Sequence, residues 1–209
     1  MSNKDYNAWV QTAYQQYGEN RCEYHNWDHV LRLRHAYEQL TGKNVVNGTA
    51  IDLAIIWHDV VYDFGPQKEF HSAWKMLDTY PSYVDLDEGD KTLEQAFIMI
   101  MSTTNHSYAD WPEYCRTIIR CDLYDLTQSD KTILNFGNIM RESMRIYNID
   151  ERTFAENNIA FMTGLIDTCK SNIAILEAET VGWYEEIQYW YDVIDGCERT
   201  VRMSREILS

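Results

Sequence analysis

Residues 50–62, AIDLAIIWHDVVY, decide the fold that this 209-residue sequence predicts. The stretch is apolar on almost every side, which is typical of a helix that its neighbours cover completely. The segment 63–66, DFGP, follows it and breaks the chain, because glycine and proline interrupt regular structure. Only short pieces such as 60–62 are compatible with a strand. We therefore expect a central helix around which the other elements pack.

Helical periodicity extends in both directions from this segment. Before it, amphipathic helices are expected at 5–17 and from a cap at Asn26 or Asp28 to about Leu40, closed by Thr41-Gly42-Lys43. After it, they are expected at 68–79, 90–104, 112–126, 129–147 and 151–167, with a solvated acidic loop at Ser82–Asp90. An aromatic-rich helical tail follows from about Ser171 to Leu208, with a break near Thr180-Val181-Gly182. The prediction is an all-α chain, with a helical domain at 1–170 and a C-terminal helical extension at 171–209.

The composition is that of an ordinary soluble helical protein. Hydrophobic residues make up 45% and charged residues 24% of the chain, while only 9 glycines and 3 prolines serve tight turns. No apolar run reaches about 18 residues, which excludes a membrane span, and the polar N-terminus lacks a signal-peptide core. The five cysteines are odd in number and form no C-x-x-C pair, so we expect reduced, buried thiols in a cytoplasmic protein.

Charge narrows the range of partners. The chain has 33 acidic and 18 basic residues and a formal net charge of −15. Such a surface repels nucleic-acid backbones and anionic lipids, so we expect no non-specific nucleic-acid binding. A small phosphorylated substrate is compatible with this charge, because a bound metal ion reverses the local field.

The sequence also places metal-binding types of side chain beside apolar segments. His58-Asp59 lies near the end of the central segment, where a buried carboxylate beside an imidazole is costly unless a metal ion compensates both. The alternative is a helix end at which Asp59 binds backbone amides. His25 and His29 are four residues apart, so they share a helix face if the helix begins early enough.

Two further positions carry polar side chains next to apolar helices. Asp122 follows an apolar helical stretch and needs a partner, whereas Asp125 fits a solvent-facing position. His106 stands at a turn after an apolar helix, where side chains often reach a cleft.

The order of His29, His58-Asp59 and Asp122 resembles the H…HD…D ligand pattern of the HD superfamily of metal-dependent phosphohydrolases. YHNWDH at 24–29 resembles the Y-H-N-x-x-H motif of an uncharacterised bacterial and phage branch, in which an arginine stands shortly before the tyrosine, as Arg21 does here. WHDVVYD at 57–63 resembles the H-D-x-V-Y-D motif of that branch. Three later motifs of the branch are also matched, by Glu69 with Ser72-Ala73, by Thr103 to His106 and by Asp122-Leu123. In the first of them, Lys68 replaces the usual asparagine. The resemblance covers about residues 20–165.

The resemblance implies a bundle of helices with a metal site at its centre and the hydrolysis of a nucleotide or similar small phosphate ester. The implied ligands of a divalent ion (Mn, Fe, Co, Ni or Zn, with Mg as an alternative) are His29, His58, Asp59 and Asp122. The resemblance also implies that His25, Asp28, Glu69 and His106 lie beside these ligands or bind a second ion. Arg21 and Lys68 are the nearby cations for a substrate phosphate, while His71 is expected to face solvent.

Two other functions stay open at this point. Some HD proteins bind two irons and oxidise small molecules with O₂, and they use additional histidines. A non-catalytic binding protein that keeps the fold is the third hypothesis, although all four ligand positions are filled here. In any of these, the aromatic tail after Ser171 is expected to pack on the bundle or to form a homo-oligomer contact, through Trp183, Tyr184, Trp190 and Tyr191.

Overall fold

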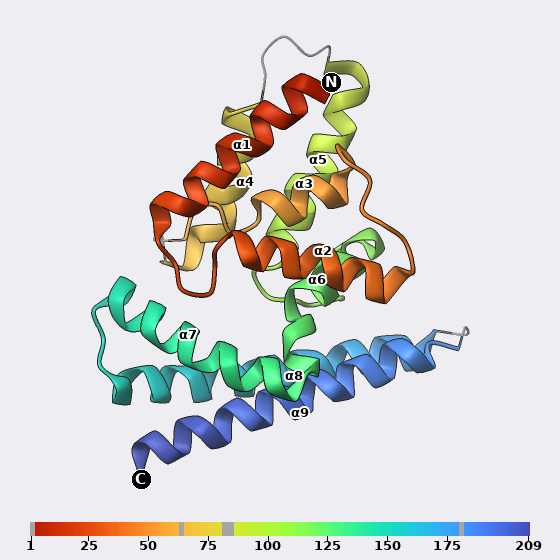
Figure 1. The fold of residues 1–209 in the computed structure, drawn as a ribbon. Coiled ribbons are helices and arrows are strands. Elements are labelled where there is room, and N and C mark those ends of the chain that lie inside the picture. Colours follow the sequence, from red (N-terminus) through yellow and green to blue (C-terminus); the bar gives the residue numbers. More distant parts are fainter. Residues whose placement is uncertain (1–2, 63–64, 81–85, 180–181) are drawn as a thin grey trace. The chain divides into compact units, whose positions relative to one another are not determined.

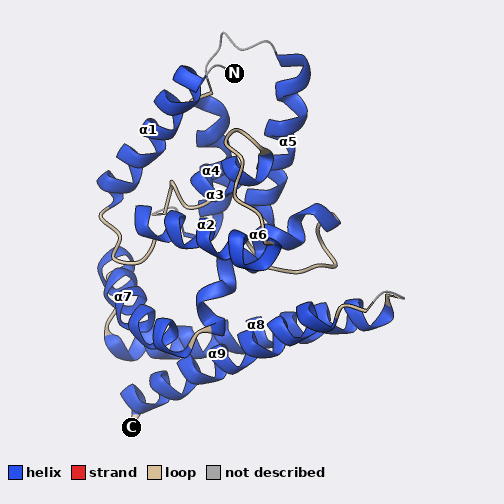
Figure 2. Cartoon of the chain, turned by 45° about the vertical axis from the view of Figure 1, so that its right-hand side comes forward, coloured by secondary structure: helices blue, strands red, loops and turns tan. Residues whose placement is uncertain are grey.

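The computed structural model describes residues 3–62, 65–80, 86–179 and 182–209. All regular elements in these ranges are helical, as Figure 2 shows by colour. The all-α prediction is therefore confirmed for the described part of the chain. The residues fall into two compact units: a first unit of Met1–Thr104 with Tyr114–Asp122, and a second unit of Asn105–Glu113 with Leu123–Ser209.

The first unit is built around the apolar segment that opened the sequence analysis. Its helices are α1 (Asn3–Asn20), α2 (Trp27–Thr41), α3 (Ala50–Trp57), α4 (Lys68–Asp78), α5 (Leu86–Ser102) and α6 (Arg116–Leu123). Every residue of α3 from Asp52 to Trp57 is buried. The helix contacts α1, α2, α4 and α5, so the expected central helix is confirmed (Figure 1).

The central helix is shorter than the sequence predicts. It ends at Trp57, because groups on two other helices bind the main chain that follows. The Asn20 side-chain amide in α1 donates to the Val60 carbonyl (2.8 Å), and the Val61 N–H donates to the Ser72 hydroxyl in α4 (3.0 Å). Ser72 Oγ also donates to the Val61 carbonyl (3.2 Å). Tertiary hydrogen bonds thus replace the helical ones and hold this segment in place.

Local signals in the sequence set the ends of α2. Asn26 is the N-cap, and its side chain accepts hydrogen bonds from the amides of Asp28 and His29. Gly42 follows the last turn in the left-handed conformation (φ 66°), and its N–H donates to the Glu38 carbonyl. Both the predicted cap and the predicted closure are confirmed.

A buried carboxylate ties α1 and α2 to the start of α3. Asp52 accepts hydrogen bonds from the Tyr6 hydroxyl (2.6 Å) and the Gly48 N–H (2.8 Å), and it forms an ion pair with Arg34. All its bonds are internal to the first unit. This network satisfies a fully buried acid without a metal ion.

The second unit consists mainly of long helices. They are α7 (Ser129–Tyr147), α8 (Glu151–Ala178) and α9 (Tyr184–Leu208), preceded by the short 3₁₀ helix η3 (Tyr124–Thr127). The helices α8 and α9 lie side by side along most of their length (Figure 1). α8 is longer than predicted and runs through the expected boundary at residues 170 and 171. The expected break falls between α8 and α9, although residues 180–181 lie outside the described part.

Helix limits in the middle of the chain also differ from the predictions. α5 begins at Leu86, so the end of the predicted acidic loop is helical, while its residues 82–85 lie outside the described part. Residues 63–64 of the predicted break lie outside the described part of the chain. The 3₁₀ helix η1 (Gly65–Gln67) follows them. The helix predicted at 112–126 is divided into η2 (Glu113–Cys115), α6 and η3.

The aromatic residues of the tail are only partly covered. Trp190 is fully buried in the second unit and makes an edge contact with the Tyr108 ring (centroids 5.3 Å apart). The Tyr108 hydroxyl donates to Glu186 of α9 (2.6 Å). Tyr184, in contrast, is 83% exposed, and Tyr191 is about half exposed. The expectation that the tail packs on the bundle or forms a homo-oligomer contact stays a prediction.

Gly196 lets α9 approach η3 closely. A Cβ atom at this position would lie 2.1 Å from the main-chain oxygen of Leu126, far inside contact distance. Alanine improves helix propensity by about 1 kcal/mol, but the clash with a main-chain atom outweighs that gain. We expect Gly196→Ala to lower the free energy of unfolding by about 1–3 kcal/mol in urea denaturation.

Gly164 in α8 supplies the matched control for this substitution. Nothing lies within 4 Å of its Cβ position, so alanine adds helix propensity without a clash. Gly164→Ala is expected to raise the free energy of unfolding by about 0.5–1 kcal/mol. Equal losses of stability in both variants would contradict the close approach at Gly196.

Among the described residues, α8 is the one helix long and apolar enough to cross a membrane by length and composition, which the sequence criterion missed. A single such helix is weak evidence for a membrane protein, because core helices of soluble proteins share these properties. Its buried asparagines bond within the second unit: the Asn158 amide donates to Ser204 Oγ (2.9 Å), and Asn172 Oδ1 accepts from the Tyr108 N–H (2.8 Å). These bonds are typical of a helix packed inside a protein.

The five cysteines are buried and free, as the sequence predicts. Burial raises the pKa of Cys121 and of Cys197 to about 12. Their thiols therefore stay protonated and unreactive near neutral pH.

Candidate metal centre

Four residues that are distant in sequence meet inside the first unit. His29 comes from α2, His58 and Asp59 follow α3, and Asp122 lies near the end of α6. One ligand atom of each lies within 4.8 Å of the others. The two histidines and Asp59 are buried, whereas the side chain of Asp122 is 16% exposed. The sequence pattern and the fold thus lead to the same group, which we call the His/Asp cluster.

Three distances within the His/Asp cluster match those between ligands of one ion, while the His29–Asp59 and His58–Asp122 distances are longer, at 3.7 Å. His58 Nε2 lies 3.0 Å from Asp59 Oδ2, and His29 Nε2 lies 3.3 Å from Asp122 Oδ1. The two Nε2 atoms are 3.3 Å apart. Two ligand atoms held about 2.1 Å from one ion at angles of about 90–110° lie about 3.0–3.4 Å apart. The donor atoms, imidazole nitrogens and carboxylate oxygens, are those that first-row divalent metals accept.

The chain fixes the orientation of the His58 ring. His58 is the C-cap of α3, and its Nδ1–H donates to the Ile55 carbonyl one turn earlier (3.1 Å). This bond leaves Nε2 as the atom that faces the cluster. Hydrogen bonds of this kind orient metal-binding histidines in proteins.

The His29 ring has a different partner. Its Nδ1 lies 3.3 Å from Nη2 of Arg32, which can only donate a hydrogen bond. With Nδ1 as an acceptor, a neutral ring carries its proton on Nε2, toward the Asp122 carboxylate. An ion that binds at Nε2 requires the other neutral tautomer, with the proton on Nδ1, so ion binding changes the contact of this ring with Arg32.

Lys68 and His25 surround the outer side of Asp59. Lys68 Nζ lies 3.2 Å from Asp59 Oδ1, the oxygen that is not shared with His58. The ammonium also lies 4.2 Å from the centre of the Tyr62 ring. His25 stacks on the same ring (3.9 Å), and its Nε2 is 3.8 Å from Asp59 Oδ2. Two basic side chains and an aromatic ring therefore border the His/Asp cluster.

The electrostatics of the cluster are governed by burial and by its carboxylates. Burial lowers the pKa of His29 to about 4. Burial also acts to lower the pKa of His58, but Asp59, Asp122 and the hydrogen bond to Ile55 together outweigh it and raise this pKa to about 9. Although burial opposes ionisation of Asp59, Lys68 and His58 hold the pKa of Asp59 well below its usual range. Asp59 is thus ionised, and one imidazole of the pair is neutral and available as a ligand.

The other residues that the resemblance implies lie in different surroundings. Glu69 is buried and lies 3.5 Å from Lys68 Nζ. Asp28 is exposed in the first turn of α2, where a carboxylate stabilises the helix N-terminus. Arg21 is exposed, with a left-handed backbone (φ 51°). His106 belongs to the second unit, where its carbonyl accepts from the Asn172 amide (2.9 Å), and its role at the cluster stays a prediction.

The helix that carries His29 begins too late to include His25. His25 and His29 do not share a helix face, because Asn26 caps α2 and His25 precedes the helix. His25 reaches Asp59 from the loop instead. Tyr62, which orders His25 and Lys68, was not singled out from the sequence, although it stands in the same motif as His58. An aromatic residue gives no sequence signal for this role.

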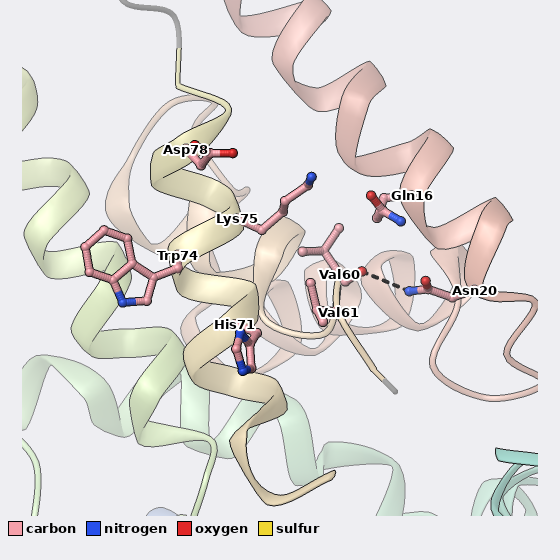
Figure 3. Close-up of a pocket in the computed structure, with 8 residues that line it drawn as sticks. All are labelled: Gln16, Asn20, Val60, Val61, His71, Trp74, Lys75 and Asp78. Atoms are coloured by element: carbon pink, nitrogen blue, oxygen red, sulfur yellow. Dashed lines mark hydrogen bonds between the residues drawn. The ribbon is translucent and has the colours of Figure 1, made fainter. Parts of the chain in front are cut away.

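A separate cleft of about 530 Å³ opens elsewhere on the first unit (Figure 3). Its floor is formed by Val60 and Val61, and its walls come from α1 and α4, with Gln16, Asn20, His71, Trp74, Lys75 and Asp78. None of the His/Asp cluster lines it. His71, expected to face solvent, is half-buried at this cleft.

Comparisons of the chain with models of protein families, with curated proteins and with solved structures gave no match. The resemblance to the HD superfamily therefore rests on the motif residues. The helical fold and the His/Asp cluster are compatible with it.

Proposed function

We propose that this chain is a cytoplasmic, metal-dependent phosphohydrolase that acts on a nucleotide or similar small phosphate ester. The observation that carries the proposal is the convergence of two imidazoles and two carboxylates, from three separate chain segments, within 4.8 Å. A purely structural ion pair does not need four such groups in one place. The order of the motif residues indicates the reaction class, and the geometry of the His/Asp cluster supports an ion at the centre of this cluster.

Charge supports a divalent ion in this position. Among the described residues, the carboxylates of Asp59, Asp122 and Glu69 lie around two cationic groups, the Lys68 ammonium and the His58 imidazole with its pKa of about 9. Buried negative charge in excess of its partners is costly, and a divalent cation removes the excess. The same ion lets a phosphate approach in a chain whose net charge is −15. When bound, such an ion polarises a phosphoryl oxygen and activates a water molecule.

The remaining residues have roles that follow from their positions. The side chains of Lys68 and His25 are 22% and 13% exposed, so both can reach a bound molecule. The ammonium of Lys68 and a ring N–H of His25 suit the non-bridging oxygens of a phosphate. Tyr62 holds the two side chains on its ring and thereby orients them. Asp59 keeps Lys68 protonated, since it raises the pKa of Lys68 well above its ordinary value although burial opposes this.

Metal analysis followed by a phosphate-release screen tests the proposal. The purified chain is loaded with Mn²⁺, Co²⁺, Fe²⁺, Ni²⁺, Zn²⁺ or Mg²⁺ and incubated with nucleotides and with simple phosphate monoesters. We expect about one tightly bound ion per His/Asp cluster and ion-dependent release of phosphate. O₂ consumption with two bound irons would instead support the oxygenase, and ion binding without any turnover would support a binding protein.

Lys68→Met provides a sharper test of the phosphate contact. We expect the variant to bind its ion but to bind inorganic phosphate about tenfold more weakly, because a charge-assisted hydrogen bond is lost. Isothermal titration of the ion-loaded protein measures this affinity. Lys75→Met is the matched control, since Lys75 lies two turns later on α4 and lines the other cleft. Equal phosphate affinities for wild type and Lys68→Met would remove Lys68 from the site.

A further inference from the structure

The cleft that Figure 3 shows on the first unit carries two opposite charges that do not pair with each other. Lys75 and Asp78 lie three residues apart on α4, and both line this cleft of about 530 Å³. Among the described residues, neither side chain has a hydrogen bond or an ion pair. The fold therefore leaves a cation and an anion in one cleft, open to a ligand.

Helix stability accounts for one of these charges and not for the other. Lys75 lies in the last turn of α4, where the helix dipole favours a cation. Asp78 is the last residue of the same helix, where the dipole disfavours a carboxylate. A carboxylate that weakens its own helix and binds no other side chain needs a different explanation, and a ligand in the cleft supplies one.

The wall that α1 contributes presents hydrogen-bond acceptors. Gln16 and Asn20 extend from this helix toward α4 (Figure 3). The Asn20 amide nitrogen already donates to the Val60 carbonyl (2.8 Å), and the Gln16 amide nitrogen donates to Glu19 (3.2 Å). Their amide oxygens are the atoms left for a ligand, and oxygens of this kind accept hydrogen bonds from an ammonium group. Together with Asp78, they form an acceptor side of the cleft.

The floor of the cleft adds apolar surface between these polar groups. Val61 is half-buried there, and its main-chain N–H and carbonyl both bond to the Ser72 hydroxyl (3.0 and 3.2 Å). The floor therefore offers a ligand only the Val61 side chain. Trp74, which is 52% exposed, also lines the cleft. Apolar surface of this kind is stabilised when an apolar group covers it.

We infer that this cleft binds a small zwitterion of the class of free α-amino acids with an apolar side chain. Lys75 binds its carboxylate, and Asp78 binds its ammonium group together with the two amide oxygens of α1. The apolar side chain lies over Val61. The two charges of such a molecule cancel, so the net charge of −15 does not repel it. No residue of the His/Asp cluster lines the cleft, so the inference does not depend on the proposed function.

Leucine and two analogues that each lack one charge test the inference. Leucinamide keeps the ammonium group, and N-acetylleucine keeps the carboxylate. Their affinities for the full chain are measured by NMR titration without divalent ions, in 0.15 M salt that screens long-range attraction. The main-chain signals of Val61 and Lys75 report binding in the cleft. We expect leucine to bind at least about threefold more tightly than either analogue, because each analogue loses one charged contact.

Lys75→Met and Asp78→Asn each remove one side of this preference. In Lys75→Met, leucine should no longer bind more tightly than leucinamide, whereas Lys75→Arg keeps the charge and should keep the preference. In Asp78→Asn, leucine should no longer bind more tightly than N-acetylleucine. Asp78→Asn should also melt at or above the wild-type temperature, so that its loss of binding is not a loss of folding. Lys43→Met, at an exposed lysine outside the cleft, is the control and should bind all three compounds like the wild type.

Three outcomes would overturn the inference. The first is equal affinity of the wild type for leucine and its analogues. The second is a preference for leucine that survives both Lys75→Met and Asp78→Asn, because other charges then hold the ligand. The third is binding of leucine without any change in the signals of Val61 and Lys75. None of these results bears on the proposed function, which fails if the wild type binds no divalent ion or releases no phosphate.

Discussion

Asp59→Ala is expected to abolish divalent-ion binding and ion-dependent phosphate release, while the protein stays folded. The carboxylate lies between His58 and Lys68 and supplies one of only two negative charges among the four cluster residues. Without it, an ion loses a ligand and half of its charge compensation, which should cost nearly all of the rate. Metal content, circular dichroism and phosphate release, measured on the same preparation, check the prediction.

The alternative role for Asp59, a helix cap, gives a different result. Loss of a cap costs about 0.5–2 kcal/mol of stability and leaves the activity per folded molecule intact. The contacts of the Asp59 carboxylate are with Lys68 and the histidines. A purified Asp59→Ala protein that keeps its metal and its activity would nevertheless restore the capping role.

Asp52→Asn is the matched control for removing a buried negative charge. Asp52 is also fully buried in the first unit, but its partners are Tyr6, Arg34 and Gly48. We expect this variant to melt at a lower temperature, since Arg34 loses its partner, and to keep its ion stoichiometry. Loss of ion binding in both variants would mean that the effect of Asp59→Ala is general destabilisation.

Ending the chain before Ser171 is expected to unfold the second unit. The truncation removes the last eight residues of α8 and all of α9, with the buried side chains of Ile173, Leu176, Trp190 and Val193. Each such side chain contributes about 1.5–3 kcal/mol when buried, so the combined loss is comparable with the whole stability of a domain. We expect a loss of helical circular dichroism and of cooperative melting, or an insoluble product.

Removal of residues 207–209 is the control for this truncation. These residues form the last part of α9 and the C-terminus, and none of them is buried. The melting temperature should change by little. A full truncation that melts like the intact chain, in the same oligomeric state, would show that α9 contributes nothing to the fold.

Much of the fold could be predicted because its signals are local. The all-round apolar character of 50–62 indicated a covered helix, and Asn26 and Gly42 set the ends of α2. The end of α3 at Trp57 could not be predicted, because it depends on Asn20 and Ser72, which lie on other helices. The close approach at Gly196 could not be predicted for the same reason, because the sequence does not show whether another segment packs against a helical glycine.

The candidate site divides in a similar way. The order of the motif residues led to four side chains that the fold brings within 4.8 Å. Which residues form the site was easier to predict than how their side chains are arranged. The stacking of His25 on Tyr62 and the position of Lys68 over the same ring depend on a loop conformation.

The wide sequence separation of the cluster residues has a consequence for folding. His29 and His58 are 29 positions apart, and Asp59 and Asp122 are 63 apart. An ion bound by all of them is a reversible crosslink that closes two long loops, much as disulfides do in other proteins. Such a crosslink favours the folded first unit by about 2.7 kcal/mol at a free ion concentration of one hundred times Kd. The resistance of this unit to heat and proteolysis would then follow the supply of metal in its surroundings.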